Sequence, residues 1–284
     1  KALGAVGFTD DGVPIKDTAI VMEAMKMAKA LDVPLSFHEE DPALIGSFGV
    51  NQGPVSAAVG VEGAPAVAED VLVARDCALA LSTGASIDIQ HISSAHSVAL
   101  VRCAKALGAP VFAEATPHHF TLTDEALLTY GTLAKMNPPL RTKEDVEALQ
   151  KGLADDIMDV IATDHAPHAA SEKEQGIQKA PFGIVGLETA AALTYTALVK
   201  PGILTPMQMA EKMSYNPAKI LGLDKGTVEA GSPADLTIFD PECEWVIDPA
   251  EFLSKGKNTP FGGKKVTGKV MATIVDGEIV YQEK

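Results

Sequence analysis

The sequence is poor in cysteine, in long apolar runs and in positive charge. Its three cysteines, Cys77, Cys103 and Cys243, show no C-x-x-C spacing, which argues against a disulfide framework and a thiolate zinc site. No apolar run approaches the roughly 18 residues of a membrane span. With 23 Lys and Arg against 38 Asp and Glu, the net charge is −15, the wrong sign for binding nucleic acid or an anionic membrane. We therefore expect a soluble, cytoplasmic protein.

The apolar pattern predicts an α/β fold. A short β-rich run followed by a helical pattern recurs along the first part of the 284 residues, which is typical of βα units on a parallel sheet. We expect strands near 4–8, 33–37, 86–89, 111–115 and 158–162, and helices near 18–31, 64–83, 97–107 and 187–199. After Pro217 the pattern changes to short alternating strands with glycine turns. We therefore place a barrel-type domain at residues 1–223 and a small β module at 224–284.

Residues able to bind a metal follow every predicted strand. They are Asp10, Asp11, His38, Glu39, Glu40, His91, His118, His119, Asp164 and His165. In a parallel β/α barrel the carboxyl ends of the strands share one face, where active sites are built. One histidine at a strand end is more often a hydrogen-bonded loop residue than a ligand. Several consecutive units that bring imidazole and carboxylate groups to one rim predict a site for zinc or a similar divalent cation.

Neighbouring side chains at this rim need not share a role. Asp10 and Asp11 are expected to point to opposite sides of their strand, so that only one faces the mouth. We expect at least one of His118 and His119 to orient its neighbours through hydrogen bonds, and assign neither to metal. A solvated acidic rim is the simplest interpretation of Glu39, Glu40 and Asp41.

An ordered set of motifs resembles the dihydroorotases of the amidohydrolase superfamily, in the bacterial type found with aspartate transcarbamoylase. The resemblance covers essentially the whole chain. Its most specific pieces are 8–12 (FTDDG), 37–40 (FHEE), 90–93 (QHIS), 116–120 (TPHHF), 135–141 (KMNPPLR) and 162–168 (ATDHAPH). The stretch 231–236 (GSPADL) is similar to the superfamily's C-terminal β-sandwich.

The resemblance implies a barrel enzyme with two zinc ions that hydrolyses (S)-dihydroorotate reversibly to N-carbamoyl-L-aspartate in pyrimidine biosynthesis. It implies that Asp11 bridges both ions and that His38 and His91 bind one of them. Asp164 would bind the other ion and transfer the proton during catalysis. The same resemblance implies that the substrate is held by Asn137, His168, Phe182 and Gly183. A mobile loop at 169–180 is expected to precede the last two.

The sequence argues against some related hydrolases and leaves two other functions as alternatives. Hydantoinases and dihydropyrimidinases usually hold a carboxylated lysine where this chain has Asp11, which argues against them. An allantoinase-like cyclic-ureide hydrolase is an alternative. So is a non-catalytic dihydroorotase-like scaffold that assembles with aspartate transcarbamoylase. We also expect aspartate transcarbamoylase as a possible partner of an active enzyme, and a homodimer.

One family feature is missing from this sequence. The family's His-x-His pair and its nearby arginine lie on the first barrel strand, and no His-x-His occurs here. Five strands make only part of an eight-stranded barrel, and an open sheet leaves edges unpaired. We therefore expect a partial TIM-like barrel, strands 4 to 8, plus the C-terminal part of a β-sandwich. The first strands would come from a preceding segment or another polypeptide, and residues 1–284 alone should have little dihydroorotase activity.

Overall fold

A five-stranded parallel sheet organises the first part of the chain. The computed structural model describes residues 1–283. The strands follow one another in sequence order and are β1 (Phe8–Thr9), β2 (Leu35–Phe37), β3 (Ile87–Ile89), β4 (Val111–Ala115) and β5 (Val160–Ile161). Each neighbouring pair is parallel. The predicted α/β class and its parallel sheet are confirmed.

Helices connect these strands. They are α1 (Thr18–Leu31), α2 (Pro54–Ala58), α3 (Val67–Thr83), α4 (Ala95–Ala106), α5 (Pro117–Thr121), α6 (Ala126–Tyr130), α7 (Lys143–Ala154), α8 (Ala170–Lys173), α9 (Ala190–Thr194), α10 (Pro206–Ala210) and α11 (Asn216–Ile220). Single 3-10 turns lie at Gly131–Ala134 and Pro249–Glu251, and π-helical turns at Tyr195–Val199 and Glu211–Tyr215 extend α9 and α10. Within residues 1–283, none of the helices has both the length and the apolar character to cross a membrane.

Local sequence signals explain where the helices begin and end. The Asp17 carboxylate accepts hydrogen bonds from the first amides of α1, and Gly84 ends α3 with a φ of 67°. The stretch 169–180, expected to be a mobile loop, contains the short helix α8, whose Lys173 is buried. The Lys173 side chain donates to Pro181 O and Gly183 O, contacts that leave no periodic pattern in the sequence, and the mobility of the stretch stays a prediction.

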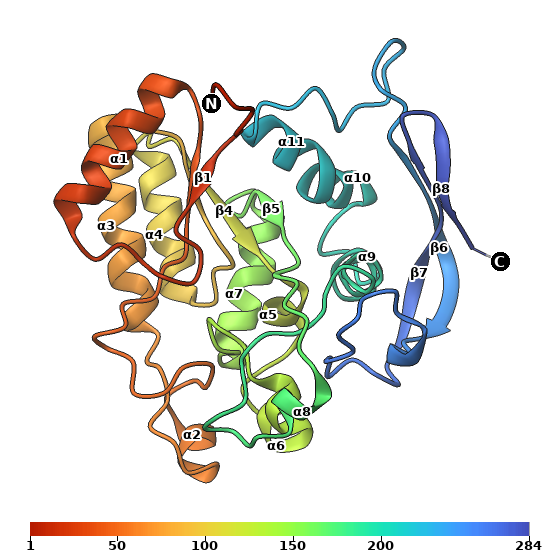
Figure 1. The fold of residues 1–284 in the computed structure, drawn as a ribbon, viewed down its shortest axis with the longest axis horizontal. Helices are drawn as coiled ribbons and strands as arrows, with labels where there is room; N and C mark the ends of the chain where they lie inside the picture. Colours follow the sequence, from red (N-terminus) through yellow and green to blue (C-terminus); the bar gives the residue numbers. More distant parts are fainter. Residues whose placement is uncertain (284) are drawn as a thin grey trace.

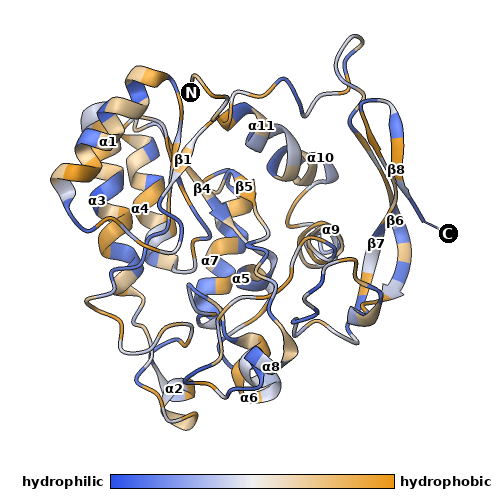
Figure 2. Ribbon diagram, viewed as in Figure 1, coloured by the Kyte–Doolittle hydropathy of each residue, from blue (hydrophilic) through white to orange (hydrophobic). Residues whose placement is uncertain are grey.

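The two faces of the parallel sheet differ. Alternating side chains such as Phe37, Ile87 and Ile89 face a large apolar core shared with α1, α3, α4 and α7. Figure 1 shows α1, α3 and α4 side by side on this face, and the mixed colours of these helices in Figure 2 fit helices with one buried side. The opposite face carries Asp88 and Glu114 and borders a cavity of 290 Å³. The apolar face therefore fixes the strands, while the other face stays polar.

A second sheet follows near the end of the chain. It is antiparallel and contains β6 (Leu236–Val246), β7 (Lys265–Val275) and β8 (Glu278–Gln282). In Figure 1 the helices α9 to α11 lie between the two sheets. The hydroxyl of Thr196 donates to Thr267 O (3.1 Å) and accepts from Thr267 N (2.8 Å), which ties the π-helical extension of α9 to β7.

Candidate metal centre

Three side chains from consecutive strand ends converge on one point. Asp11 follows β1, His38 follows β2 and His91 follows β3, and one ligand atom of each lies within 4.8 Å of the others. His38 Nδ1 is 3.0 Å from His91 Nε2 and 4.0 Å from Asp11 Oδ1. Both histidines are buried, whereas the Asp11 side chain is open to solvent. The parallel register of the strands therefore produces the predicted meeting of imidazole and carboxylate groups.

The donor set fits a divalent cation. Two nitrogens bound to one tetrahedral zinc ion lie roughly 3.3 Å apart, close to the observed separation of the two facing imidazoles. Burial lowers the pKa of His91 well below its usual value, and the neighbouring His38 adds to this effect, so His91 is a neutral imidazole with a free lone pair. Neutral imidazole is the form that ligates metals. We conclude that Asp11, His38 and His91 can hold one metal ion.

Backbone strain collects at the same place. His91 has a φ of 34° and Asp164 a φ of 48°, values that non-glycine residues seldom adopt. Such conformations cost of order 1–3 kcal/mol each and persist where the surrounding structure imposes them, often at functional sites. The strained residues are two of the candidate ligands, His91 and Asp164, and each lies just after the end of its strand.

The adjacent carboxylates Asp10 and Asp11 have different roles. Asp10 accepts hydrogen bonds from His38 N and Ile15 N, both at 3.0 Å, and so joins the end of β1 to the end of β2. Burial raises its pKa, and these two backbone donors oppose that rise. Asp11 instead belongs to the ligand cluster. As expected, only one of the pair faces the site.

The two glutamates after His38 are not a solvated rim. Glu39 and Glu40 are 2% and 1% exposed, so that interpretation was wrong. Glu39 turns inward toward Asp76 and Arg75 of α3, where burial and the Asp76 charge raise its pKa well above its usual value. The error arose because two adjacent charged residues carry no sequence signal for burial against residues of α3, which lie more than 30 positions further along the chain.

Glu40 packs against the imidazole of the candidate ligand His38. Its Oε2 is 3.4 Å from His38 Nε2, on the ring edge opposite the nitrogen that faces His91. Burial opposes protonation of His38, but the carboxylates of Glu40 and Asp11 outweigh it and raise the His38 pKa. A carboxylate next to the nitrogen that does not bind the metal helps to orient the ring of a metal-binding histidine. Glu40 is therefore a candidate functional residue that the sequence analysis did not identify.

Asp164 and Asn137 lie beside the cluster. Asp164 follows β5 outside the three-residue group, and burial together with the Asp11 charge raises its pKa to about 6, while His38 lowers it. Asn137 Nδ2 is 3.3 Å from His38 Nε2. Its Oδ1 is buried and has no hydrogen-bond partner within the described part of the chain. A candidate proton carrier and a candidate substrate amide thus adjoin the metal ligands.

His168, Phe182 and Gly183 form a second group. The His168 ring donates from Nε2 to Phe182 O (2.8 Å), and its backbone amide donates to Asn258 Oδ1. Gly183 has a φ of 97°, and a Cβ at this position would come within 2.5 Å of Ala166 Cβ. Glycine is required there because both the backbone conformation and the space exclude a side chain.

His119 has a supporting role at the site. It donates from Nε2 to Pro138 O (2.9 Å), so its Nδ1 accepts from Thr116 Oγ1 at 2.8 Å, and burial lowers its pKa to about 4. This neutral ring holds the loop that carries Asn137. His118 is equally buried, and burial lowers its pKa well below the usual value.

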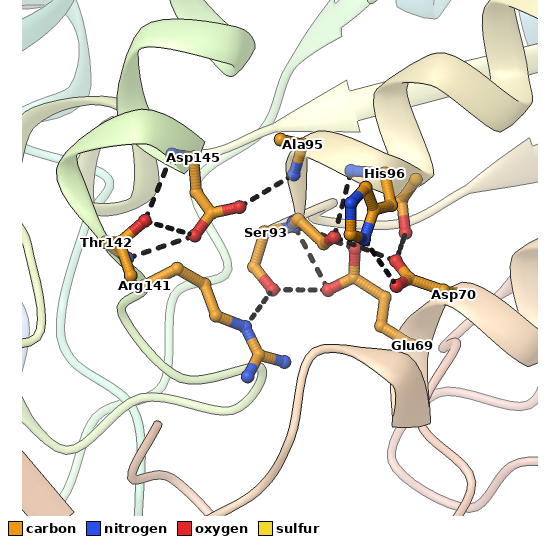
Figure 3. A network of polar contacts seen from close by, with 10 residues as sticks. Glu69, Asp70, Ser93, Ala95, His96, Arg141, Thr142 and Asp145 are labelled. Carbon is orange, nitrogen blue, oxygen red and sulfur yellow. Dashed lines mark hydrogen bonds and ion pairs between the residues drawn. The ribbon is translucent and has the colours of Figure 1, made fainter. Parts of the chain in front are cut away.

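A buried polar network anchors the same loop from the other side (Figure 3). Arg141 is 2% exposed and donates to Ser93 Oγ (3.1 Å) and Asn51 Oδ1 (3.0 Å). Ser93 in turn bonds the buried Glu69 through its amide and its hydroxyl. Figure 3 shows the Arg141 side chain directed at Ser93, between the Thr142–Asp145 turn and Glu69. The network fixes the chain after His91 to the chain after Asn137.

The comparisons identify the family to which these features belong. Residues 2–280 match the sequence profile of the amidohydrolase family, whose members are metal-dependent hydrolases. This chain belongs to the amidohydrolase family.

Individual relatives can be named. A dihydroorotase of Clostridioides difficile is 58% identical over 281 residues, covering 99% of this chain and 66% of the relative. A dihydroorotase of Clostridium acetobutylicum is 51% identical over 284 residues, covering 100% of this chain and 67% of the relative. The solved L-hydantoinase (dihydropyrimidinase) of Arthrobacter aurescens has a TM-score of 0.90 at 27% identity, covering 99% of this chain and 66% of that one. The chain thus spans about two thirds of the length of these relatives.

Proposed function

We propose that this chain carries the metal centre of a dihydroorotase, which hydrolyses (S)-dihydroorotate reversibly to N-carbamoyl-L-aspartate. The observation that carries the proposal is the cluster of Asp11, His38 and His91 in a chain 58% and 51% identical to two dihydroorotases. An aspartate in place of the carboxylated lysine that hydantoinases usually hold supports dihydroorotate over hydantoin as the substrate.

The proposed metal is zinc, two ions in the complete site. Asp11 would contact both, His38 and His91 would bind one, and Asp164 would bind the other. Imidazole and carboxylate ligands suit zinc, and the buried neutral His91 is ready to bind it. Bound there, divalent cations would supply Lewis-acid activation of a water molecule and of the attacked carbonyl.

The chain's own residues would then bind, orient and move protons. The oxygen of water is added to the ring amide carbon of dihydroorotate, and the C–N bond breaks. Asp164, at the rim of the cluster, would take the proton from the water and deliver it to the leaving ring nitrogen. Asn137 and His168, together with the backbone of Phe182 and Gly183, would hold the substrate. The unpartnered Asn137 Oδ1 next to His38 supports such a role.

We further propose that β1 to β5 are strands 4 to 8 of an eight-stranded (β/α) barrel, of which residues 1–223 form the C-terminal portion, with part of a β-sandwich at 224–284. The outer strands β1 and β5 have no further strand partner within residues 1–283. The polar face of the sheet borders the 290 Å³ cavity, whose lining includes Phe8 of β1 and Val160 of β5. Further strands between these edges would cover that face. Assembly with aspartate transcarbamoylase, a homodimer and a cytoplasmic location stay predictions.

The test is turnover and zinc content of the full-length protein, measured for the unchanged chain and for Asp11→Asn. We expect the unchanged protein to hydrolyse dihydroorotate and to bind zinc, and the variant to lose both. Asp17→Asn is the matched control, because Asp17 caps α1 and is outside the three-residue cluster, and asparagine caps helices equally well.

Each alternative has its own outcome. Turnover of allantoin or hydantoin in place of dihydroorotate would replace the proposed substrate while keeping the metal centre. A folded full-length protein with neither zinc nor turnover would contradict the proposal and support a non-catalytic scaffold.

A further inference from the structure

Four consecutive backbone carbonyls, those of residues 180–183, each accept a hydrogen bond from a distant side chain. Lys135 Nζ donates to Ala180 O (2.7 Å), and Lys173 Nζ donates to Pro181 O (2.8 Å) and Gly183 O (3.1 Å). The remaining carbonyl, Phe182 O, accepts from His168. We call residues 180–183 the clasped segment. It has no strand or helix bonds of its own, so these side chains determine its course.

The two lysines are unusual because they are buried without a carboxylate. Lys135 is 5% exposed and Lys173 is 2% exposed. No ion pair joins either of them to an acidic group anywhere in residues 1–283. Lysine is seldom buried unless it is paired, since the ammonium group loses its hydration. Here each ammonium group is satisfied only by backbone carbonyls.

The two charges also act on each other. Burial, together with the nearby positive charge of Lys135, lowers the pKa of Lys173 to about 8. Burial lowers the pKa of Lys135 as well. Two buried ammonium groups of like charge cost free energy, so an arrangement that serves stability alone would use a neutral donor or add a carboxylate. The free-energy cost of burying both ammonium groups indicates that the conformation of the clasped segment is needed for something other than stability.

The clasped segment connects the lysines to the site. Gly183 N donates back to Lys135 O at 2.8 Å, and Asn258 Nδ2 donates to Gly183 O at 3.1 Å. Lys135 also stands two residues before Asn137, so one short stretch carries both the clasp and the candidate substrate amide. The segment also borders a cavity of 670 Å³, which Lys135 and Phe182 help to line.

We propose that Lys135 and Lys173 are positioning residues that hold the backbone of Phe182 and Gly183 in the substrate-binding conformation. The inference rests on the proposed function for its kinetic readout, because it assumes that this backbone contacts the substrate. The paired charges also make this side of the site electropositive in a protein of net charge −15, which favours an anionic substrate.

The experiment compares Lys173→Met and Lys135→Met in the full-length protein. Each change removes the charge and the donor but keeps an unbranched side chain. We expect KM for dihydroorotate to rise about tenfold or more in each variant, as for loss of a charged hydrogen bond, with kcat changed much less. A second readout needs no activity. Trypsin should cut after the exposed Lys179 several times faster than in the unchanged protein, because the segment that follows is released.

The matched control is Lys212→Met. Lys212 is as buried as Lys173 and also bonds a backbone carbonyl, that of Met158, but it lies far along the chain from the clasped segment and is paired with Asp156. We expect this variant to change neither KM nor cleavage at Lys179.

The outcomes separate the two proposals. Unchanged KM and unchanged cleavage in the folded lysine variants would overturn the positioning role. If the unchanged protein turns over no dihydroorotate but trypsin still cuts the variants faster after Lys179, the positioning role is supported and the proposed substrate is wrong. Should Lys173→Met not fold, Lys135→Met and the milder Lys173→Gln, which keeps a neutral donor, decide the question by the same two readouts.

Discussion

The metal cluster and the clasped segment are built in opposite ways. Asp11, His38 and His91 stand at the ends of neighbouring strands, and backbone pairing between those strands brings them together. Residues 180–183 have no such frame, and side chains from positions 135, 168 and 173 hold their carbonyls. We expect the sheet to keep the other ligands in place when one is lost, and the clasped segment to depend on each of its donors. We therefore expect substitutions in the cluster to abolish metal binding without lowering the free energy of unfolding. Substitutions in the clasped segment's donors should instead shift the backbone of residues 180–183.

The largest effect is expected from His38→Ala. Outer-sphere partners of a metal already contribute about 10–100-fold to affinity or activity, and a direct ligand should exceed that. We expect zinc binding and turnover to fall by more than about 100-fold while the fold persists, because the strand ends do not depend on the ring. The control is His96→Ala, whose side chain is 82% exposed. Equal activity losses in both variants would argue against the cluster as the metal centre.

Arg141→Met tests the frame around the site. It removes the buried cation whose charge acts on Glu69 and which donates to Ser93, the hydrogen-bond partner of Glu69. Breaking a buried ionic network by deleting one partner costs about 3–5 kcal/mol of unfolding free energy. Arg102→Met removes a solvent-screened pair with Asp155 and should cost far less. Urea unfolding of the two variants measures the contrast, and similar midpoints would contradict it.

These two regions also show what the sequence could reveal. The five strands, their parallel arrangement and the convergence of Asp11, His38 and His91 follow from apolar runs that end in polar residues, a local pattern. The burial of Lys173 depends on contacts outside its own helix, with the carbonyls of Pro181 and Gly183 eight and ten residues along the chain. No periodicity records such contacts. The sequence therefore indicated the candidate ligands, and the structure was needed to find the buried side chains that pack around them.

Glu40→Gln addresses orientation within the cluster itself. The amide keeps the volume of the carboxylate but loses the charge that faces His38 Nε2 at 3.4 Å. We expect zinc affinity to fall about tenfold, the lower end of the range for an outer-sphere partner. Apo-protein stability should stay within about 1 kcal/mol, because neither Glu40 oxygen has a hydrogen-bond partner in the described part of the chain. Competition with a chelator measures the affinity, and an unchanged value would remove Glu40 from the site.

The smallest expected effect is a pH dependence from Lys173. Its folded-state pKa of about 8 lies below the ordinary value of 10.5, through burial first and the charge of Lys135 second. Below pH 8 both the folded and the unfolded chain hold the proton, so the cost of burying the charge is fully present. Between pH 8 and 10.5 only the unfolded chain holds it, so the unfolding free energy rises relative to Lys173→Met. Urea unfolding at pH 7.5 and 9.5 checks this, and a constant difference between the two proteins would contradict it.

The central claim is that the strand ends of β1, β2 and β3 form a metal centre. Anomalous diffraction at the zinc edge, on crystals of the full-length protein grown with zinc, tests it most directly. We predict an anomalous-difference peak within bonding distance of His38 Nδ1, His91 Nε2 and an Asp11 oxygen. Diffraction that shows zinc elsewhere, with His38 Nδ1 and His91 Nε2 still 3.0 Å apart and no peak between them, would contradict it.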